Sequence, residues 1–427
     1  MNRALTLCLA AALALSCGKK PEAGPSPGTS ATASSASAAR APTPSSTLED
    51  PLTTGGGDAV HGKELVAAFE CSRCHEGTGT PAAAFEKRCF ACHVKIVSGE
   101  LKGSKGSEAR WHDRVLDLKD VPTLTSSQRR FRRSWLASFL LEPYDLRPRL
   151  APTMPRLDLT RAQARDIAAY LADADDATAM PDLTAADPAH GRKLMEANGC
   201  GSCHRFTGAP PLEGSTPYQA DEKALSTGMA LAPDLRFARE RLRPEALIAW
   251  VSNPRAVKPD TAMPEFTLAP ADARDIAAYL LTTPLEPVPA RAPVARLPVL
   301  ERKVTYDEVS TKVFRRTCWH CHGEPDYAAG DGGPGNTGGF GFKPRGINFV
   351  DYGSVAAGRL DDRNERRSLF EKTADGTPRL VRALLARRDE EAGHPDKDVR
   401  GMPLGYPSLG PEDVQLVETW IAQGRPR

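Results

Sequence analysis

The chain contains four copies of a motif in which two cysteines, separated by two residues, are followed at once by a histidine. The four copies are Cys71-Ser-Arg-Cys74-His75, Cys89-Phe-Ala-Cys92-His93, Cys200-Gly-Ser-Cys203-His204 and Cys318-Trp-His-Cys321-His322. Two thiols one helical turn apart can add to the two vinyl groups of one porphyrin, and the adjacent imidazole then lies beneath the iron. A redox Cys-x-x-Cys pair needs no neighbouring His, and a zinc site needs paired clusters at matching separations. The motifs therefore predict four covalently attached haem c groups, whose proximal iron ligands are His75, His93, His204 and His322.

The two remaining cysteines, Cys8 and Cys17, lie in an N-terminal segment with the features of an export signal. Arg3 precedes an apolar run over residues 4–15, which is too short for a permanent membrane span. The sequence Leu13-Ala-Leu-Ser-Cys17 resembles a bacterial lipobox, in which the cysteine becomes the lipidated first residue of the mature protein. We predict a signal peptide over residues 1–17 and lipidation at Cys17; the alternative is a plain secretory peptide cleaved nearby.

The composition excludes some functions and leaves room for prosthetic groups. The 427 residues include 56 Lys and Arg against 54 Asp and Glu, and the formal net charge is only +2. A nucleic-acid-binding protein would need a stronger basic excess to neutralise phosphates. Aromatic residues make up only 6% of the chain, so the protein alone would form a thin core that four flat, apolar porphyrins would complete. Residues 18–57, rich in Ala, Ser, Pro, Thr and Gly, are predicted to be a disordered tether.

An internal repeat divides the middle of the chain into two similar segments. Each copy has a His-Gly pair ten residues before a first motif cysteine, then a Met-Pro pair, and a Tyr sixteen residues after that Met. The Met-Pro pairs begin at Met154 and Met263, and a helical stretch with a Trp precedes each. The closing helices begin after Thr160 and Pro270. We predict a domain with two haems over residues 58–180 and a domain with one haem over 181–285.

A Pro-rich linker over residues 286–304 leads to a third predicted domain over 305–427. This domain has one Cys-x-x-Cys-His motif and a Gly-rich loop over 330–346. A charged helical stretch is expected near 360–391, and a final helix over 412–423 follows Met402-Pro403. Strand signals are scarce throughout, so we expect an all-α protein of three tandem helical domains.

Together with the upstream motifs, three Met-Pro loops before closing helices resemble class I cytochrome c, whose methionine ligand arrives on such a loop. The resemblance implies that Met154, Met263 and Met402 are distal iron ligands. The segments starting at Pro122 and Pro233 are similar to the family's Pro-containing loop, whose backbone carbonyl orients the proximal His.

Residues 305–425 resemble a cytochrome c domain of planctomycete-type multidomain proteins. The matching segments are Cys318-Trp-His-Cys-His322-Gly, Ile347-Asn-Phe-Val-Asp-Tyr352, Gly401-Met-Pro403 and Glu418-Thr-Trp-Ile-Ala-Gln-Gly424. Within the first of them, His320 is expected to face solvent.

The first domain has two motifs but one Met-Pro pair, and residue counting does not decide which haem receives Met154. His93 precedes Pro122 by 29 residues, the same spacing as His204 and Pro233, which favours the second motif. The helix before Cys71 matches the helix before Cys200, which favours the first. The candidate distal ligand of the other iron is His112; His61 and Met180 are weaker candidates, and an iron without a distal protein ligand is a further alternative.

Several haems with filled axial positions favour electron transfer outside the cytoplasm. We expect no enzymatic role, although an open haem in the first domain would permit a peroxidase-like or small-oxyanion reductase activity. A sensor or scaffold role has no specific support. The expected partners are other redox proteins, such as membrane respiratory complexes or small cytochromes, and the membrane itself through the lipid. The run Arg129–Arg133 could dock an acidic partner, face solvent or pair with haem propionates.

Overall fold

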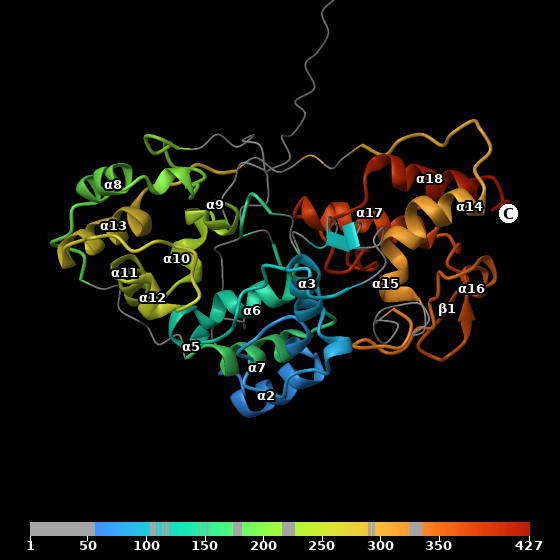
Figure 1. The fold of residues 1–427 in the computed structure, drawn as a ribbon, viewed down its shortest axis with the longest axis horizontal. Coiled ribbons are helices and arrows are strands. Elements are labelled where there is room, and N and C mark those ends of the chain that lie inside the picture. Colours follow the sequence, from blue (N-terminus) through green and yellow to red (C-terminus); the bar gives the residue numbers. More distant parts are fainter. Residues whose placement is uncertain are drawn as a thin grey trace, which may run out of the picture. The chain divides into compact units, whose positions relative to one another are not determined.

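The computed structural model describes residues 56–102, 108–109, 111–112, 115, 119–144, 146–150, 153–173, 182–215, 227–288, 292, 295–323 and 335–427. These residues all belong to one compact unit. They are mostly helical, with one pair of two-residue strands in the described ranges, so the all-α prediction is confirmed (Figure 1). Cys17, Met180 and most of the predicted tether lie outside the described residues.

The first segment, residues 56–173, is built from short helices, with its first long helix packed on its last. Its elements are α2 (Ala59–Ala68), η1 (Cys71–Arg73), η2 (Phe85–Lys87), α3 (Cys89–Val97), α5 (Ser127–Arg130), α6 (Arg133–Leu141) and α7 (Arg161–Leu171). Helix α7 begins after Thr160 as predicted, because the Thr160 hydroxyl and the Gln163 side chain form a capping box. Helices α2 and α7 pack against each other (Figure 1).

A glycine allows the close approach of α2 and α7. A Cβ added at Gly62 would overlap the backbone carbonyl oxygen of Asp166. Asp166 also ties the start of α2 to α7, since its carboxylate accepts from the Asp58 backbone N–H at 2.8 Å and pairs with His61 Nδ1 at 2.8 Å. Asp58 in turn caps α2 by accepting from the backbone N–H groups of Val60 and His61. His61, considered above as an iron ligand, is therefore held at this helix crossing.

The second segment, residues 182–288, repeats this arrangement. Its elements are α8 (Pro188–Ala197), η4 (Cys200–Ser202), α9 (Thr227–Leu231), η6 (Leu235–Phe237), α10 (Ala238–Arg241), α11 (Pro244–Ser252), α12 (Pro254–Val257) and α13 (Pro270–Thr282). Helix α8 packs on α13, with Gly191 against the Asp275 carbonyl and His190 Nδ1 2.8 Å from the Asp275 carboxylate. The sequence repeat therefore corresponds to a structural repeat.

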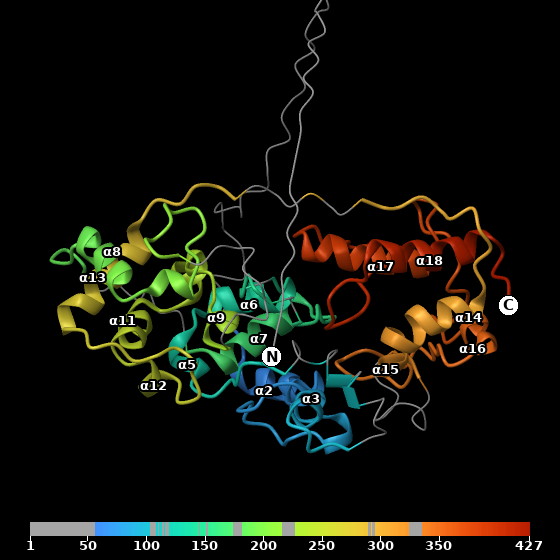
Figure 2. The ribbon, with the colours of Figure 1, turned by 45° about the horizontal axis from the view of Figure 1, so that its top comes forward.

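The third segment, residues 295–427, packs its helices around one apolar core. Its elements are α14 (Tyr306–Val309), the π-helical η7 (Ser310–Cys318), α15 (Trp319–His322), α16 (Tyr352–Ala357), β1 (Arg359–Leu360), β2 (Arg366–Arg367), α17 (Arg379–Glu391) and α18 (Pro411–Ala422). Helices α17 and α18 lie side by side, and α14 packs on α18 (Figures 1 and 2). The final helix ends within one residue of the predicted end.

The helix expected near 360–391 is wrong in its first half, where the structure has a hairpin. Strands β1 and β2 pair antiparallel, and helix α17 begins only at Arg379. The Asp361 side chain accepts from the backbone N–H groups of Arg363 and Glu365, which offers the backbone a turn in place of a helix. Asn364, in the left-handed region at φ 60°, completes that turn.

Each of the three segments has its own apolar core. The first core includes Val66, Ile167 and Ala168, the second Leu247, Ile276 and Ala277, and the third Phe314, Val417 and Trp420. Within the described residues, none of the helices is both long enough and apolar enough to cross a lipid bilayer.

Contacts join the first segment to each of the others. The Arg132 backbone N–H donates to the Arg241 carbonyl at 2.9 Å, and Phe131 packs against both the first and the second core. On the third segment, the Phe340 backbone N–H donates to the Glu70 carboxylate at 3.0 Å, and Phe340 packs against the first core.

Candidate haem-binding sites

The first and third motifs have the same backbone form. Each begins after a residue in the left-handed region, Glu70 or Gly199, and continues as a short 3-10 helix. The His75 backbone N–H donates to the Cys71 carbonyl at 2.9 Å, and His204 donates to Cys200 at 2.8 Å. This tight turn brings the two thiols and the histidine of a motif to one place on the backbone.

The two histidines of these motifs are oriented by the predicted proline loops. His75 Nδ1–H donates to the Pro122 carbonyl at 2.8 Å, and His204 Nδ1–H donates to the Pro233 carbonyl at 2.9 Å. A carbonyl only accepts, so each ring has its proton on Nδ1 and a free electron pair on Nε2, the form that binds iron. Burial lowers the pKa of both histidines and favours this neutral form, although the bond to the carbonyl partly opposes the shift.

The pairing of His75 with Pro122 distinguishes the two motifs of the first segment. The first motif, and not the second, has the geometry of the motif at Cys200. The equal spacing of 29 residues from His93 to Pro122 therefore does not reflect a structural equivalence. Cys89 and Cys92 lie on α3 instead, in an insertion between the first motif and the Pro122 loop.

The fourth motif spans the end of η7 and helix α15. Gly335 lies against the His322 ring so closely that an added Cβ would overlap it. Burial lowers the pKa of His322 to about 4, which keeps the imidazole neutral. Its Nδ1 lies beside the Ile347 backbone but outside regular hydrogen-bond geometry. Gly335 and Ile347 therefore lie beside the His322 ring, without the hydrogen bond that the proline loops accept in the other segments.

The histidine of the second motif lies at the boundary with the third segment. His93 is only 6% exposed. Its ring centroid lies 6.2 Å from that of His320, which lies between the two cysteines of the fourth motif. His320 is exposed as predicted, but it also packs edge-on to Tyr406 with a centroid separation of 6.4 Å. His112 is half-buried in the described pair of residues 111–112.

The three Met-Pro loops all lie beside a motif or a tryptophan. Met154 packs on the same core as Cys71, and Met402 on the same core as Cys318. Met263 Sδ accepts a hydrogen bond from Trp250 Nε1–H at 2.9 Å, on the helix that the sequence analysis placed before this loop. All three methionines are half-buried.

The thiols lie in apolar surroundings that suit attachment to a porphyrin. Burial raises the pKa of Cys71 and Cys200 to about 11 and that of Cys318 to about 12. The interaction of the Cys74 thiol with the neighbouring Cys89 thiol, together with burial, raises the pKa of Cys74 well above its usual value. The first and second motifs are thus in direct contact.

The third segment contains a buried cation that suits a cofactor with an apolar body and anionic groups. Arg388 is 5% exposed, and both of its terminal guanidinium nitrogens are buried with no hydrogen-bond partner. It follows Leu384 by one turn of α17, so it lies on the side that faces the core containing Cys318 and Met402. A buried charge is costly unless it is paired. A haem propionate would supply the partner.

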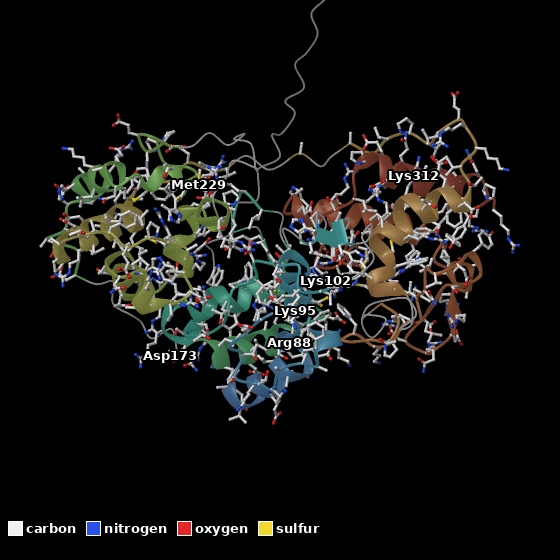
Figure 3. The ribbon with its side chains drawn as sticks, viewed as in Figure 1. Arg88, Lys95, Lys102, Asp173, Met229 and Lys312 are labelled. Atoms are coloured by element: carbon white, nitrogen blue, oxygen red, sulfur yellow. The ribbon has the colours of Figure 1, made fainter. Side chains whose placement is uncertain are left out.

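The run Arg129–Arg133 is largely an internal anchor rather than a docking surface. Arg130 donates from Nε to the Ser126 carbonyl and from Nη2 to the Thr125 carbonyl. Arg132 Nε donates to Leu242 in the second segment, and Arg133 donates to the Ala172 carbonyl. Three further basic residues, Arg88, Lys95 and Lys102, lie on α3 or next to it, away from this run in the sequence (Figure 3).

The Met154 and Met402 loops are joined by a buried ion pair. Arg156 Nη2 lies 3.0 Å from the Glu390 carboxylate, whose side chain is 8% exposed. The same carboxylate accepts from the Gly401 backbone N–H at 3.0 Å, next to Met402. A cavity of about 230 Å³ beside this pair is lined by Tyr144, Met154 and Glu390, among others. No local pattern indicates this pair, because the two residues are separated by more than 200 positions.

A helical segment with a paired-cysteine turn, a carbonyl-oriented histidine and a methionine loop defines a haem-binding domain of the c type. Residues 188–284, which run from the start of α8 beyond the end of α13, match the family model described as Cytochrome c. Cytochrome c-552 of Bradyrhizobium diazoefficiens is 32% identical over 108 residues, which cover 25% of this chain and 83% of that protein. No solved structure matches the chain. The chain belongs to the cytochrome c family, and it is a haem electron-transfer protein with covalently bound haem c.

Proposed function

We propose that this chain is a tetrahaem cytochrome c that transfers electrons outside the cytoplasm. The observation that carries the proposal is the repetition of one site. The first motif has the same turn, the same histidine-to-carbonyl bond and the same helix crossing as the motif inside the family match. The second and fourth motifs supply the same three residue types, two cysteines and a histidine. When bound, each haem iron cycles between the ferric and ferrous states and so carries one electron.

The proposed ligand set follows the contacts around each motif. His75 and Met154 hold the first iron, His204 and Met263 the iron of the second segment, and His322 and Met402 that of the third. Cys71 and Met154 share one core, and this supports assigning Met154 to the first motif. His93 is the proposed proximal ligand at the second motif, where His112 is the distal candidate from the sequence.

Contacts within the first segment and between the first and third segments support an electron carrier, because they bring proposed haem sites together. The Cys74 and Cys89 thiols lie beside each other, so two attachment sites are neighbours. The pair Arg156–Glu390 fixes the Met154 loop against the Met402 loop. Electron transfer between cofactors requires short separations, and these contacts would supply them without any movement of the segments.

We further propose that the protein is exported and anchored by a lipid on Cys17. Its three domains would span residues 58–180, 181–285 and 305–427. The tether over residues 18–57 would then let it reach membrane respiratory complexes or small cytochromes. Family membership supports a location outside the cytoplasm, since covalent haem attachment to Cys-x-x-Cys-His is a feature of exported proteins.

Mass spectrometry of the mature protein tests both parts of this proposal. We expect four haems bound through thioether links and an N-terminal peptide that begins with a lipidated Cys17. Three haems or fewer, with every motif cysteine intact, would contradict the tetrahaem assignment. A mature N-terminus that begins elsewhere and bears no lipid would contradict the anchor and leave the haem count as a separate result.

A further inference from the structure

The proximity of His93 and His320 joins two motifs that belong to different segments. His93 ends the second motif on α3, and His320 lies inside the fourth motif on α15, more than 200 residues later. Their ring centroids are 6.2 Å apart, and their planes are inclined by 38°. The His93 side chain is buried, whereas that of His320 is exposed and lies edge-on to Tyr406.

This separation matches that of two imidazoles on opposite sides of a single metal ion. A metal–imidazole bond is about 2 Å long and the nitrogen lies roughly 1.2 Å from the ring centre, so two such rings have centres about 6.4 Å apart. Rings stacked face to face would lie closer, whereas edge-on pairs such as His320 and Tyr406, at 6.4 Å, reach the same separation. The angle of 38° between the ring planes is compatible with binding to one metal ion, because each ring can rotate about its own bond to the metal.

The backbone of the fourth motif turns His320 away from the haem that the same motif holds. Successive residues of a helix are rotated by about 100°, so His320 is about 200° from both Cys318 and His322. Cys318 and His322 must face one porphyrin, and His320 therefore faces the opposite side. The ring of His93, 6.2 Å from that of His320, is a neighbour of the ring that faces this way.

Contacts on either side of the pair fix the third segment against the first. The Arg73 guanidinium lies 5.1 Å from the centre of the Phe340 ring, and the Phe340 backbone N–H donates to Glu70. Arg400 pairs with Asp158 at 3.1 Å. Tyr406, whose ring meets His320 edge-on, is held through its carbonyl by Arg387 Nε at 2.9 Å.

We propose that His320 is the distal axial ligand of the haem attached to Cys89 and Cys92, with His93 as its proximal ligand. This inference rests on the proposed function, and it replaces His112 as the candidate for that position. The ligand comes from another domain, so the third segment completes the second haem site. The resulting haem is low-spin, and its reduction potential is lower than those of the haems with a methionine ligand, because imidazole donates more to ferric iron.

Electron paramagnetic resonance of the oxidised, full-length protein tests this assignment. The wild type should be entirely low-spin. The variant His320→Ala should keep four haems by mass spectrometry and show a high-spin signal from about a quarter of the iron. Added imidazole should return this signal to low-spin, which would not occur if His320 merely supported the fold. The matched variant His112→Ala should stay low-spin.

Several outcomes would overturn the inference. A fully low-spin His320→Ala protein with four haems excludes His320 as a ligand, and a high-spin signal in His112→Ala assigns the position to His112. A high-spin signal already present in the wild type and unchanged in His320→Ala shows an iron without a distal protein ligand. If His320→Ala fails to mature, His320→Met provides the test, because it should stay low-spin with one raised potential; four unchanged potentials would exclude His320. A wild type without haem at Cys89 and Cys92 would instead contradict the proposed function, and this inference with it.

Discussion

The first and second segments share one scaffold but differ in what surrounds their methionine loops. In both, a glycine, an aspartate and a histidine fix the crossing of two helices. In the second segment, Trp250 Nε1–H donates to Met263 Sδ at 2.9 Å, and the neighbouring Pro264 and Glu265 are exposed. In the first, Trp135 Nε1–H donates at 2.8 Å to Tyr144, and the Met154 loop meets the third segment. The two segments thus share the helix crossing beside the Cys-x-x-Cys-His motif. They differ in the contacts of the methionine loop, which meets the third segment in the first case and Trp250 in the second.

The helix crossing should respond most strongly to substitution, and in both segments alike. Gly62→Ala and Gly191→Ala each place a methyl group on an aspartate carbonyl of the opposing helix. We expect each to destabilise its own segment by about 3 kcal/mol, because the crossing must open to relieve the overlap. Hydrogen exchange of α2 and α8 would locate the loss. Gly56→Ala is the control, since nothing lies within 4 Å of its added Cβ. Equal stability of all three variants would contradict the account of the crossing.

The methionine ligands should show the second largest effect. Met263→Ala should lower one reduction potential by on the order of 0.1 V, roughly 2 kcal/mol, because loss of the thioether favours ferric iron. Met154→Ala should do the same for a different haem, and the four haems should stay attached. Met195→Leu, a change in a side chain that is 2% exposed in the second core, should leave all potentials unchanged. Potentiometric titration followed by absorbance distinguishes these cases, and unchanged potentials in Met263→Ala would remove it from the ligand set.

Removing an ion pair near each methionine loop should lower the stability of the first segment more than that of the second. Arg156→Ala leaves the Glu390 carboxylate buried without this partner, which destabilises the fold. Glu390 keeps Arg387 and the Gly401 N–H as partners, so we expect the free energy of unfolding to fall by only about 2 kcal/mol. The matched pair near Met263 is Arg255 with Glu265, 3.9 Å apart and more than half exposed. Arg255→Ala should cost less than about 0.5 kcal/mol. Denaturant unfolding of the two variants measures the difference. Similar losses in both would show that the contact with the third segment contributes little.

Local patterns in the sequence predicted much of the fold and of the sites. The motifs, the proline loops and the helix start at Thr160 depend on neighbouring residues or on a repeat, so they can be recognised in one chain. The histidine-to-carbonyl bonds were implied by the resemblance and are confirmed at Pro122 and Pro233. The helix expected before residue 379 was wrong, because the Asp361 turn outcompeted the helical pattern of charges.

Contacts between distant parts of the chain could not be predicted in this way. Counting residues could not decide between His75 and His93, because an insertion changes spacing without changing the fold. Nor did any local pattern link Arg156 to Glu390 or His93 to His320, since each pair forms only when the first and third segments pack together. His320 was correctly expected to be exposed, but its neighbour is set by the tertiary structure.

The central claim is that one chain carries four redox-active haems, and coulometric reduction of the exported protein followed by absorbance tests it most directly. We predict that the fully oxidised protein takes up four electrons per chain, reversibly, and that the reduced protein passes them to a small c-type cytochrome. Uptake of fewer than four electrons, or a reduced protein that retains its electrons in the presence of such an acceptor, would contradict the account.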